Sequence, residues 1–232
     1  MKYSYYEVYI TALRAFGGMG FPYGADEDAA FIIAWLELNN LNGINLLVKS
    51  IQKIDNKYDG KISVQNNQCN FDFNNSSILM KGPTLVDYLN FKFEKQKKIE
   101  ITINNADNAN YFIPLFYKNS NKIFSKLTYI NVNNKKISYL FINNTMKVGI
   151  SSNSINLKNN QIKISLSNKK NFFNFHKIQE HKTSDTIQKN LSKSLSPNVD
   201  DWKIIEKIAN RTFVPESDES RKKGAGGIDD ND

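Results

Sequence analysis

The sequence contains one cysteine, two histidines and three arginines among its 232 residues. A single cysteine, Cys69, excludes an internal disulfide and a zinc site built from several cysteines. No uninterrupted apolar run approaches the roughly 18–20 residues that cross a bilayer, so we expect no membrane partner. The N-terminal stretch from Met1 to Phe16 includes Glu7 and Arg14, where a signal peptide would need an apolar stretch. We therefore expect a soluble, cytoplasmic protein.

Positive charge is concentrated in the middle of the chain. The formal net charge is +8, and residues 81–190 hold 18 basic and six acidic side chains. Such a segment could bind nucleic-acid phosphates. Base reading and stacking favour Arg and exposed aromatic side chains, yet these cations are all Lys and no nucleic-acid motif is present. The composition argues against a nucleic-acid partner, and solvated Lys on strand faces and edges is the alternative.

Helical patterns fill the N-terminal segment (1–58). Ser4 and Glu7 have the spacing of a capping box, in which each caps the other's backbone amide. Three acidic residues, 26–28, suit the first turn of a second helix because the helix dipole favours negative charge there. An apolar stripe follows at helical spacing, and a third helical stretch comes after Gly43. The stripe comprises Phe31, Ala34, Trp35 and Leu38, and the third stretch contains Ile44, Leu47, Val48 and Ile51.

The middle of the chain, residues 59–180, has β patterns. Apolar and polar residues alternate along Ile99–Ile103 and Ile162–Leu166. Asn143-Asn144 has turn chemistry, and Pro114 predicts an edge or a break in a strand. Short strands without helices between them predict an antiparallel sheet or sandwich. The other predicted strands are Lys61–Val64, Ser77–Met80, Tyr111–Tyr117, Ile123–Val132, Ile137–Ile142 and Met146–Ile150.

The C-terminal part divides into a polar stretch, a helix and a tail. We interpret residues 181–199 as a linker, because they are polar and rich in Ser, Lys and Thr. A helix is predicted to begin near Asp200 or Asp201 with Ile204, Ile205 and Ile208 packing inward, and to end at Val214-Pro215. The predicted fold is therefore α+β, with an N-terminal helical layer (1–58), a β domain packed with it (59–180), the linker, and a C-terminal helix with a Gly/Asp-rich tail (200–232).

The tail holds the candidate ligand-binding residues. Because this chain uses Lys for most positive charges, its three arginines suggest places that need a planar fork on a carboxylate or phosphate. Glycines present backbone amides closely to an anion, and nearby serines add donors. The candidates are Arg14, Arg211, Thr212, Ser217, Ser220, Arg221, Gly224 and Gly226. The alternatives are structural salt bridges for the arginines and a disordered C-terminus for the tail.

Three segments carry a resemblance to a bacterial family known as domain of unknown function 3726. They are residues 12–29, including Gly20-Phe21-Pro22-Tyr23-Gly24; Lys81-Gly82-Pro83-Thr84 with Asp87; and Arg211-Thr212-Phe213-Val214-Pro215 to Asn231-Asp232. The chain resembles this family over nearly its whole length, although the final glycines, Gly224-Ala225-Gly226-Gly227, depart from a longer Gly-Ala alternation. The family implies no activity. Taken without the resemblance, Lys81-Gly82-Pro83 indicates a turn.

Residues 29–44 also resemble, faintly, the N-terminal helices of the malate/L-lactate dehydrogenase family, which binds NAD(P) without a Rossmann domain. In that family a Ser-His-Gly sequence follows, whereas Asn45-Leu46-Leu47 stands here. The catalytic histidine has no counterpart, so the activity and its cofactor are not transferred. A shared helical packing motif is the simpler interpretation.

Other chemistry is sparse, and two functions remain open. His176 and His181 have no carboxylate pair to form a metal site with them, and Cys69 has no basic neighbour in sequence to lower its pKa. Neither a catalytic set nor a cofactor is indicated.

One hypothesis is a metabolic enzyme or ligand-binding protein that recognises a small anionic metabolite through its C-terminal Arg/Ser/Gly segment. The other is a non-catalytic accessory subunit whose C-terminal arm docks on a protein partner or on its own homo-oligomer.

Overall fold

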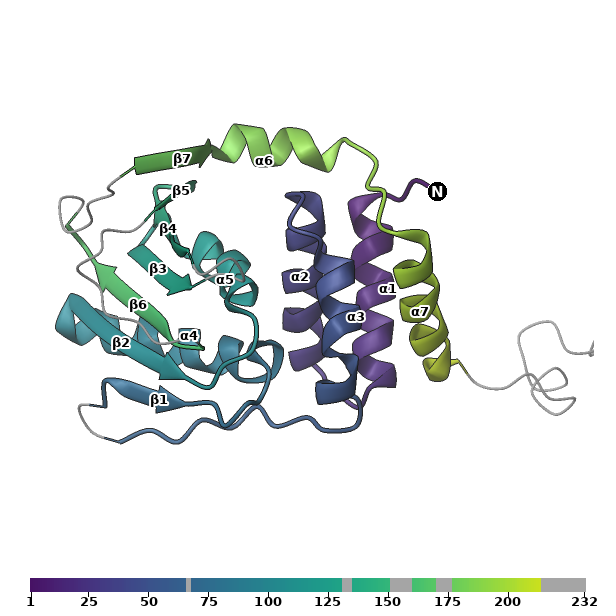
Figure 1. The fold of residues 1–232 in the computed structure, drawn as a ribbon, viewed down its shortest axis with the longest axis horizontal. Coiled ribbons are helices and arrows are strands. Elements are labelled where there is room, and N and C mark those ends of the chain that lie inside the picture. The colour runs from purple at the N-terminus through teal and green to yellow at the C-terminus, as the bar shows by residue number, and fades with distance from the viewer. Residues whose placement is uncertain (66–67, 131–134, 151–159, 170–176, 214–232) are drawn as a thin grey trace, which may run out of the picture.

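The computed structural model describes residues 1–65, 68–130, 135–150, 160–169 and 177–213. Helices α1, α2, α3 and α7 stand side by side, and a seven-stranded sheet lies beyond them with helices α4 and α5 (Figure 1). This arrangement confirms the predicted α+β class with its N-terminal helical layer, central sheet and C-terminal helix. Within the described residues, no helix combines the length and the apolar character that a membrane span requires.

Helix α1 (Tyr5–Gly18) begins at the predicted capping box. The Glu7 amide donates to Ser4 Oγ at 3.2 Å, and the Ser4 amide donates to Glu7 Oε2 at 2.6 Å. Two of the four backbone donors that a helix start leaves unpaired are thereby satisfied. The buried face of α1, formed by Val8, Ala12, Ala15 and Phe16, packs on α2.

Helix α2 (Ala25–Leu38) is the central helix of the fold. It follows Gly24, whose φ of +85° is a conformation that suits glycine. The predicted stripe is only part of its apolar surface, because nine of its residues are buried and they surround the helix. A helix that is apolar all round needs partners on every side. Helices α1 and α3 pack on α2 from within the helical layer, and α4 and α5 pack on it from the sheet side.

Helix α3 (Gly43–Ile54) comes very close to α2, and a Cβ at Gly43 would collide with the carbonyl oxygen of Ile33. Its N-cap residue, Asn42, makes no side-chain capping bond. The Ile44 amide instead donates to Glu37 Oε2 of α2 at 3.0 Å. The Glu37 side chain of α2 thus accepts a hydrogen bond from a backbone amide in the first turn of α3, and this bond holds the two helices together at that end.

The seven strands form one mixed sheet. Its order is β1-β2-β6-β3-β4-β5-β7, and every pair is antiparallel except β1–β2, which is parallel. The predicted turn Asn143-Asn144 joins β4 to β5 with both φ angles positive. The strands are β1 (Asn70–Asp72), β2 (Lys98–Asn104), β3 (Phe124–Ile130), β4 (Lys136–Ile142), β5 (Thr145–Ile150), β6 (Ile162–Ser167) and β7 (Lys177–Lys182).

The two faces of the sheet differ in polarity. The register places Ile101 of β2, Ile164 of β6 and Leu127 of β3 in one row, and all three belong to the core. The opposite face carries polar side chains such as Thr128 and Ser138, whose hydroxyls lie 2.8 Å apart. The apolar face therefore packs against α4 and α5, which fill the space between the sheet and α2.

Two predicted strands are helices. Ser77–Met80 is the start of α4 (Ile78–Gln96), and Tyr111–Tyr117 spans the end of a 3-10 turn, η1 (Ala109–Tyr111), and helix α5 (Phe112–Lys118). Short apolar runs have no periodicity that separates a buried helix from a buried strand. Capping explains why Ser77–Met80 begins a helix rather than a strand. Ser77 Oγ donates to Asp107 Oδ2 at 2.6 Å, and the Ile78 amide donates to Asp107 Oδ1 at 2.9 Å.

Further local predictions in this region are also corrected. Lys61–Val64 lies in no strand. Lys81-Gly82-Pro83 is not a turn but part of α4, and Pro114 lies within α5 rather than at a strand break. Pro114 is the third residue of α5, where a missing amide hydrogen costs least, whereas Pro83 lies inside α4 and removes one helical hydrogen bond. The described part of residues 59–180 therefore contains α4 and α5 as well as strands.

The described residues from 177 to 213 contain more secondary structure than a linker followed by one helix. Residues 181–199, predicted as a linker, include the end of β7 and helix α6 (Ser184–Leu191). Helix α7 (Val199–Ala209) is capped by Asn198 rather than by an aspartate, since Asn198 Oδ1 accepts from the amides of residues 200 and 201. It ends before the predicted Val214-Pro215, in the 3-10 turn η3 (Asn210–Thr212). Ile205 and Ile208 pack inward as predicted, whereas Ile204 is 41% exposed.

Candidate functional site

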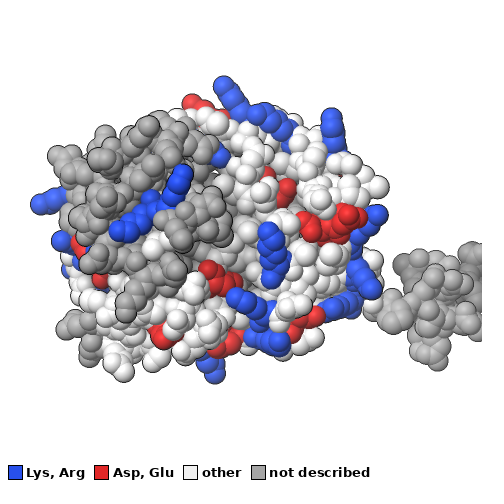
Figure 2. Space-filling model, in the orientation of Figure 1, with Lys and Arg blue, Asp and Glu red and all other residues white. Residues whose placement is uncertain are grey.

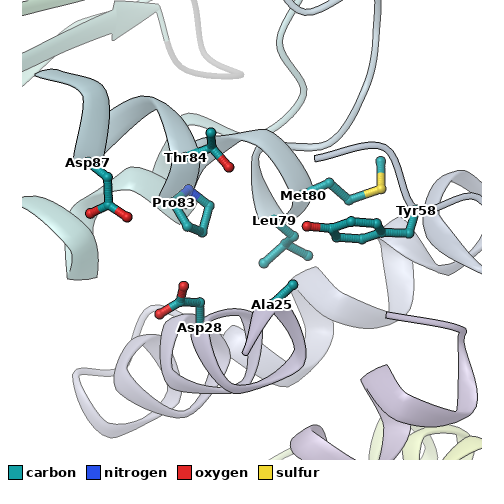
Figure 3. A pocket seen from close by; sticks show the side chains of 8 residues that line it. All are labelled: Ala25, Asp28, Tyr58, Leu79, Met80, Pro83, Thr84 and Asp87. Carbon is teal, nitrogen blue, oxygen red and sulfur yellow. The ribbon is translucent and has the colours of Figure 1, made fainter. Parts of the chain in front are cut away.

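A cavity of about 200 Å³ lies between α2 and α4, and the chain around Tyr58 closes one side of it (Figure 3). Helix α2 contributes Ala25 and Asp28, and the first three turns of α4 contribute most of the remaining wall. In Figure 3 the side chains of Asp28 and Asp87 approach the space from the two helices. The lining consists of Ala25, Asp28, Tyr58, Leu79, Met80, Pro83, Thr84 and Asp87, and it includes no basic residue.

Helical spacing explains why these side chains converge. Ala25 and Asp28 are three residues apart and so share one face of α2. On α4, Met80, Thr84 and Asp87 recur at the same kind of spacing. Pro83 adds a backbone feature, because it has no amide hydrogen to donate to the carbonyl of Leu79 four residues earlier. The wall thus combines two carboxylates and two hydroxyls with a carbonyl that Pro83 leaves without its helical donor.

Tyr58 is held in place by its surroundings. Its ring meets the Phe21 ring edge-on, with centroids 4.9 Å apart. The next residue, Asp59, forms an ion pair of 2.9 Å with the almost fully buried Lys81 of α4. Gly60 lies so close to the Tyr58 hydroxyl that a Cβ there would collide with it. The segment that follows α3 is therefore clamped on α4, and this fixes the third wall of the cavity.

Negative charge dominates the electrostatics of the cavity. Burial raises the pKa of the half-buried Asp28 carboxyl, and the negative charges of Asp87 and Glu27 raise it further. The Lys118 ammonium opposes this rise in the pKa of Asp28. Burial and the nearby Asp28 and Asp59 also raise the pKa of the Tyr58 hydroxyl. The cavity therefore suits a hydroxyl or a cationic group, and Asp28 is the carboxylate best suited to accept a proton.

Three of the sequence-predicted residues lie in the described part of the chain, near the C-terminal end of α1. The Arg211 guanidinium pairs with Asp55 at 2.7 Å, and the Arg14 guanidinium lies over the Phe213 ring, 5.2 Å from its centroid. Thr212 Oγ1 donates to the Ala209 carbonyl at 2.8 Å. The structure thus brings Arg14, Arg211 and Thr212 together, but in contacts within the fold. The Arg211 contact is a salt bridge of the kind named as its structural alternative, whereas Arg14 makes a cation–π contact.

The other candidate residues cannot be placed relative to the cavity. Ser217, Ser220, Arg221, Gly224 and Gly226 lie outside the described residues, as does His176. His181 is in β7, opposite Lys147 of β5. Cys69 is exposed, and no group of three or more metal-ligating side chains occurs in the part of the chain that the structure describes.

On the face shown in Figure 2, Lys and Arg side chains are separated by acidic and uncharged residues over the part that is described. In the sheet, Lys163 of β6 pairs with Glu100 of β2 at 3.3 Å.

One protein-family match covers the N-terminal third of the chain. Residues 3–76 match the family described as Protein of unknown function (DUF3726). The predicted family resemblance is confirmed over that range. The match includes Asp28 and Tyr58 of the cavity and ends one residue before α4 is capped. No curated protein is significantly similar to the chain in sequence.

Solved structures with a similar fold include dehydrogenases. A malate dehydrogenase from Entamoeba histolytica has a TM-score of 0.59 at 10% identity, with 93% of this chain and 99% of that chain covered. A dehydrogenase from Sinorhizobium meliloti has a TM-score of 0.61 at 7% identity, with 90% of this chain and 99% of that chain covered. At such identities the likeness establishes the fold alone. The faint resemblance to malate/L-lactate dehydrogenases is thus confirmed as a likeness of fold.

Sequence reasoning misses this cavity, although several of its residues stand out in the sequence. The local patterns place Asp28 at a helix start and Pro83 in a turn. In the sequence, residues 12–29 and Lys81-Gly82-Pro83-Thr84 with Asp87 are separate segments of one resemblance, and the structure places residues from both on one cavity. The family match covers only the first of these segments.

Proposed function

We propose that this protein is a metabolic enzyme or a ligand-binding protein that holds a small metabolite in the cavity between α2 and α4. The observation that carries this proposal is the convergence of Asp28 of α2 and Asp87 of α4, far apart in the sequence, on one cavity that also has apolar lining residues. Small-molecule sites combine apolar walls with a few placed polar groups in this way. The malate dehydrogenase of similar fold supports a small organic acid as the ligand class.

The anionic group of the metabolite is recognised by the C-terminal Arg/Ser/Gly segment. Arg14, Arg211 and Thr212 are already engaged at the end of α1, so their role is to anchor the start of that segment. Arg221 is the remaining arginine, and with Ser217, Ser220 and the glycines it supplies the fork and the amides that bind a carboxylate or phosphate.

If the protein is an enzyme, Asp28 is the residue that accepts a proton from the ligand. Its raised pKa makes the carboxylate a better proton acceptor than an exposed aspartate, since burial destabilises its charged form. A ligand hydroxyl or ammonium placed between Asp28 and Asp87 would donate to both. Tyr58 and Thr84 orient such a group through their hydroxyls.

Thermal-shift measurements test the proposal. Full-length protein is screened against small carboxylic acids, phosphate esters and nicotinamide nucleotides, because a ligand that binds the native state stabilises it by RT ln(1 + [L]/Kd). We expect a stabilising acid whose effect is lost in Asp28→Asn and in Arg221→Ala. Arg221→Lys is the matched control that keeps the charge and loses the fork. Stabilisation by no compound, or stabilisation unchanged in both variants, would contradict the proposal.

A non-catalytic accessory subunit is the second candidate, and the region after the second helix favours it. The catalytic histidine of the dehydrogenases that the chain faintly resembles has no counterpart here, and Asn45 donates to Asp201 Oδ2 of α7 at 2.7 Å as a packing contact. On this alternative the C-terminal arm docks on a protein partner or a second copy. Deleting residues 214–232 would then change the complex mass measured by native mass spectrometry and leave any ligand response unchanged.

A further inference from the structure

A second cavity, of about 480 Å³, is lined by residues 61–63, by β1 and the turn after it, and by Lys81 of α4. Its volume falls within the roughly 300–1,000 Å³ that small-molecule sites occupy. It shares no lining residue with the cavity between α2 and α4, and the lining residues of both belong to the described part of the chain. Phe71, Phe73 and Lys81 are buried, whereas Lys61 is exposed. The second cavity thus combines apolar walls with charged groups.

Lys81 is the buried charge of this cavity. It follows Met80 of the first cavity by one residue, which turns it by about 100° around α4. Its side chain is only 10% exposed, and its ammonium lies 2.9 Å from Asp59 Oδ2, its one ion-pair partner among the described residues. An ammonium has three hydrogens to donate, and a buried charge is costly unless its hydrogen bonds are made. Lys81 therefore has donor capacity left for an oxygen atom inside the cavity.

Lys61 brings a second cation to the same place. The hydrogen bond from Lys81 lowers the pKa of the Asp59 carboxyl, and the charge of Lys61 lowers it further. Both ammonium groups therefore lie near this carboxylate. Asp59 is not a lining residue of the cavity, so it offsets part of their charge without occupying the cavity itself.

Asp72 is the acidic residue of the lining, and its oxygens already have donors. Asn105 Nδ2 donates to both of them at 3.0 Å, and the Asn74 amide donates to Oδ1 at 2.8 Å. Two cations of the lining, Lys61 and Lys81, therefore stand against one carboxylate that is already engaged. The groups left to bind a ligand are chiefly donors, and they favour an oxygen-rich anion.

We infer that this cavity binds the phosphoryl group of a small phosphorylated molecule, with Lys61 and Lys81 as its cations. A lysine ammonium acts as a point charge and suits a phosphate, whereas the two coplanar oxygens of a carboxylate favour the fork of an arginine. A phosphoryl group also has three acceptor oxygens, which donors on different segments of the chain can share. Ser63 and Asn74 add such donors to the lining. This site is separate from the cavity of the proposed function and does not depend on it.

A titration with inorganic phosphate tests the inference. Amide shifts of the full-length protein are followed in ¹H–¹⁵N NMR spectra at constant pH and ionic strength. We expect selective, saturable shifts at Lys61, Ser63 and Asn74, with a Kd in the millimolar range. Lys61→Gln should raise this Kd about tenfold, because it removes one of the two cations. Lys203→Gln, which removes an exposed lysine on α7, is the matched control and should leave the Kd unchanged.

Lys81 is tested together with its partner, because Lys81→Gln alone would remove one member of an ion pair in the fold. The double variant Asp59→Asn/Lys81→Gln removes both charges, and circular dichroism checks that it is folded. Phosphate binding should be lost in this variant, and binding that persists there would overturn the inference. If the double variant does not fold, the exposed position of Lys61 keeps the test decisive.

The remaining outcomes separate a phosphate site from its alternatives. The absence of saturable shifts, or a Kd that Lys61→Gln leaves unchanged, would overturn the inference. Equal shifts with succinate at the same ionic strength would also overturn it, because the cavity would then take any anion. Asp28→Asn alters only the first cavity, so it should leave phosphate binding unchanged. A loss of binding in Asp28→Asn would instead assign the phosphate to the first cavity.

Discussion

Arg211 and Asp55 form an ion pair of 2.7 Å although they are 156 residues apart in the chain. The pair joins the 3-10 turn after α7 to the end of α3, and Arg211 also reaches the carbonyl of Gly18 at 3.5 Å. One of three arginines in the protein therefore serves as a clamp between the first and last parts of the helical layer. Both contacts come from Nη1 of the guanidinium group, whose two hydrogens can be donated to a carboxylate and a carbonyl together.

Replacing Arg211 should weaken this clamp without removing ligand binding. We expect Arg211→Ala to lower the free energy of unfolding by about 0.5–1 kcal/mol, since the pair is partly exposed and screened by water. Urea unfolding of the single variants and of Arg211→Ala/Asp55→Asn measures the coupling between the two residues. A loss of ligand stabilisation in Arg211→Ala that exceeds the loss in Arg221→Ala would instead assign Arg211 to the ligand.

Gly18 should be indispensable for the packing of α7 on α1. A Cβ at Gly18 would lie 2.6 Å from the Ile208 carbonyl oxygen, which is backbone and cannot rotate away. We expect Gly18→Ala to destabilise the protein by about 1–3 kcal/mol, as overpacking does. Thermal unfolding monitored by circular dichroism measures this change.

Gly17→Ala is the matched control for Gly18→Ala. Its Cβ would make only an ordinary contact, 3.6 Å from Thr212 Cγ2. Because alanine favours a helix by about 1 kcal/mol over glycine, Gly17→Ala should be neutral or stabilising. Equal destabilisation by the two variants would show that α7 does not pack on α1 at this point.

Asp28→Asn should stabilise the protein at neutral pH by about 0.5 kcal/mol, since it removes a partly desolvated charge that faces Asp87. The pKa of Asp28 is raised in the folded state, so the folded protein binds this proton more tightly than the unfolded chain does. Its contribution to stability is therefore present at low pH and is lost as pH rises from the ordinary aspartate pKa through the folded one. Urea unfolding at a series of pH values should show an advantage of Asp28→Asn that grows with pH above about 4. An advantage that is constant with pH would argue against this charge effect, and Asp185→Asn should show little change.

Glu37 should act as the N-terminal cap of α3. Glu37→Ala removes the acceptor of the Ile44 amide and should cost about 1 kcal/mol. Glu37→Gln keeps an acceptor oxygen and should cost little at neutral pH, because burial raises the pKa of the Glu37 carboxyl and disfavours its charge. The two variants are compared by chemical denaturation at pH 7. An equal loss in both would show that the negative charge, rather than the hydrogen bond, stabilises the helix start.

Local sequence patterns predicted those helices and strands that are determined by residues close to one another in the chain. The capping box of α1 depends on two residues three positions apart, and the alternation of β2 and β6 reports one buried face and one polar face. The same reasoning failed for Ser77–Met80, because the cap of α4 is completed by Asp107, which lies 29 residues beyond Ile78. It also failed for α5, which is buried around most of its surface and so shows no helical period.

The sequence by itself determined the α+β class, the starts of the first two helices and most strands, because these follow from hydrogen bonds and burial within a few residues. It also singled out residues 12–29 and Lys81-Gly82-Pro83-Thr84 with Asp87 as separate segments. Only the tertiary structure decided that residues of both segments meet at one cavity, and that Arg14 contacts Phe213 and Arg211 contacts Asp55. Those outcomes depend on which helix faces pack together, and packing sums many weak contacts between residues far apart in the chain.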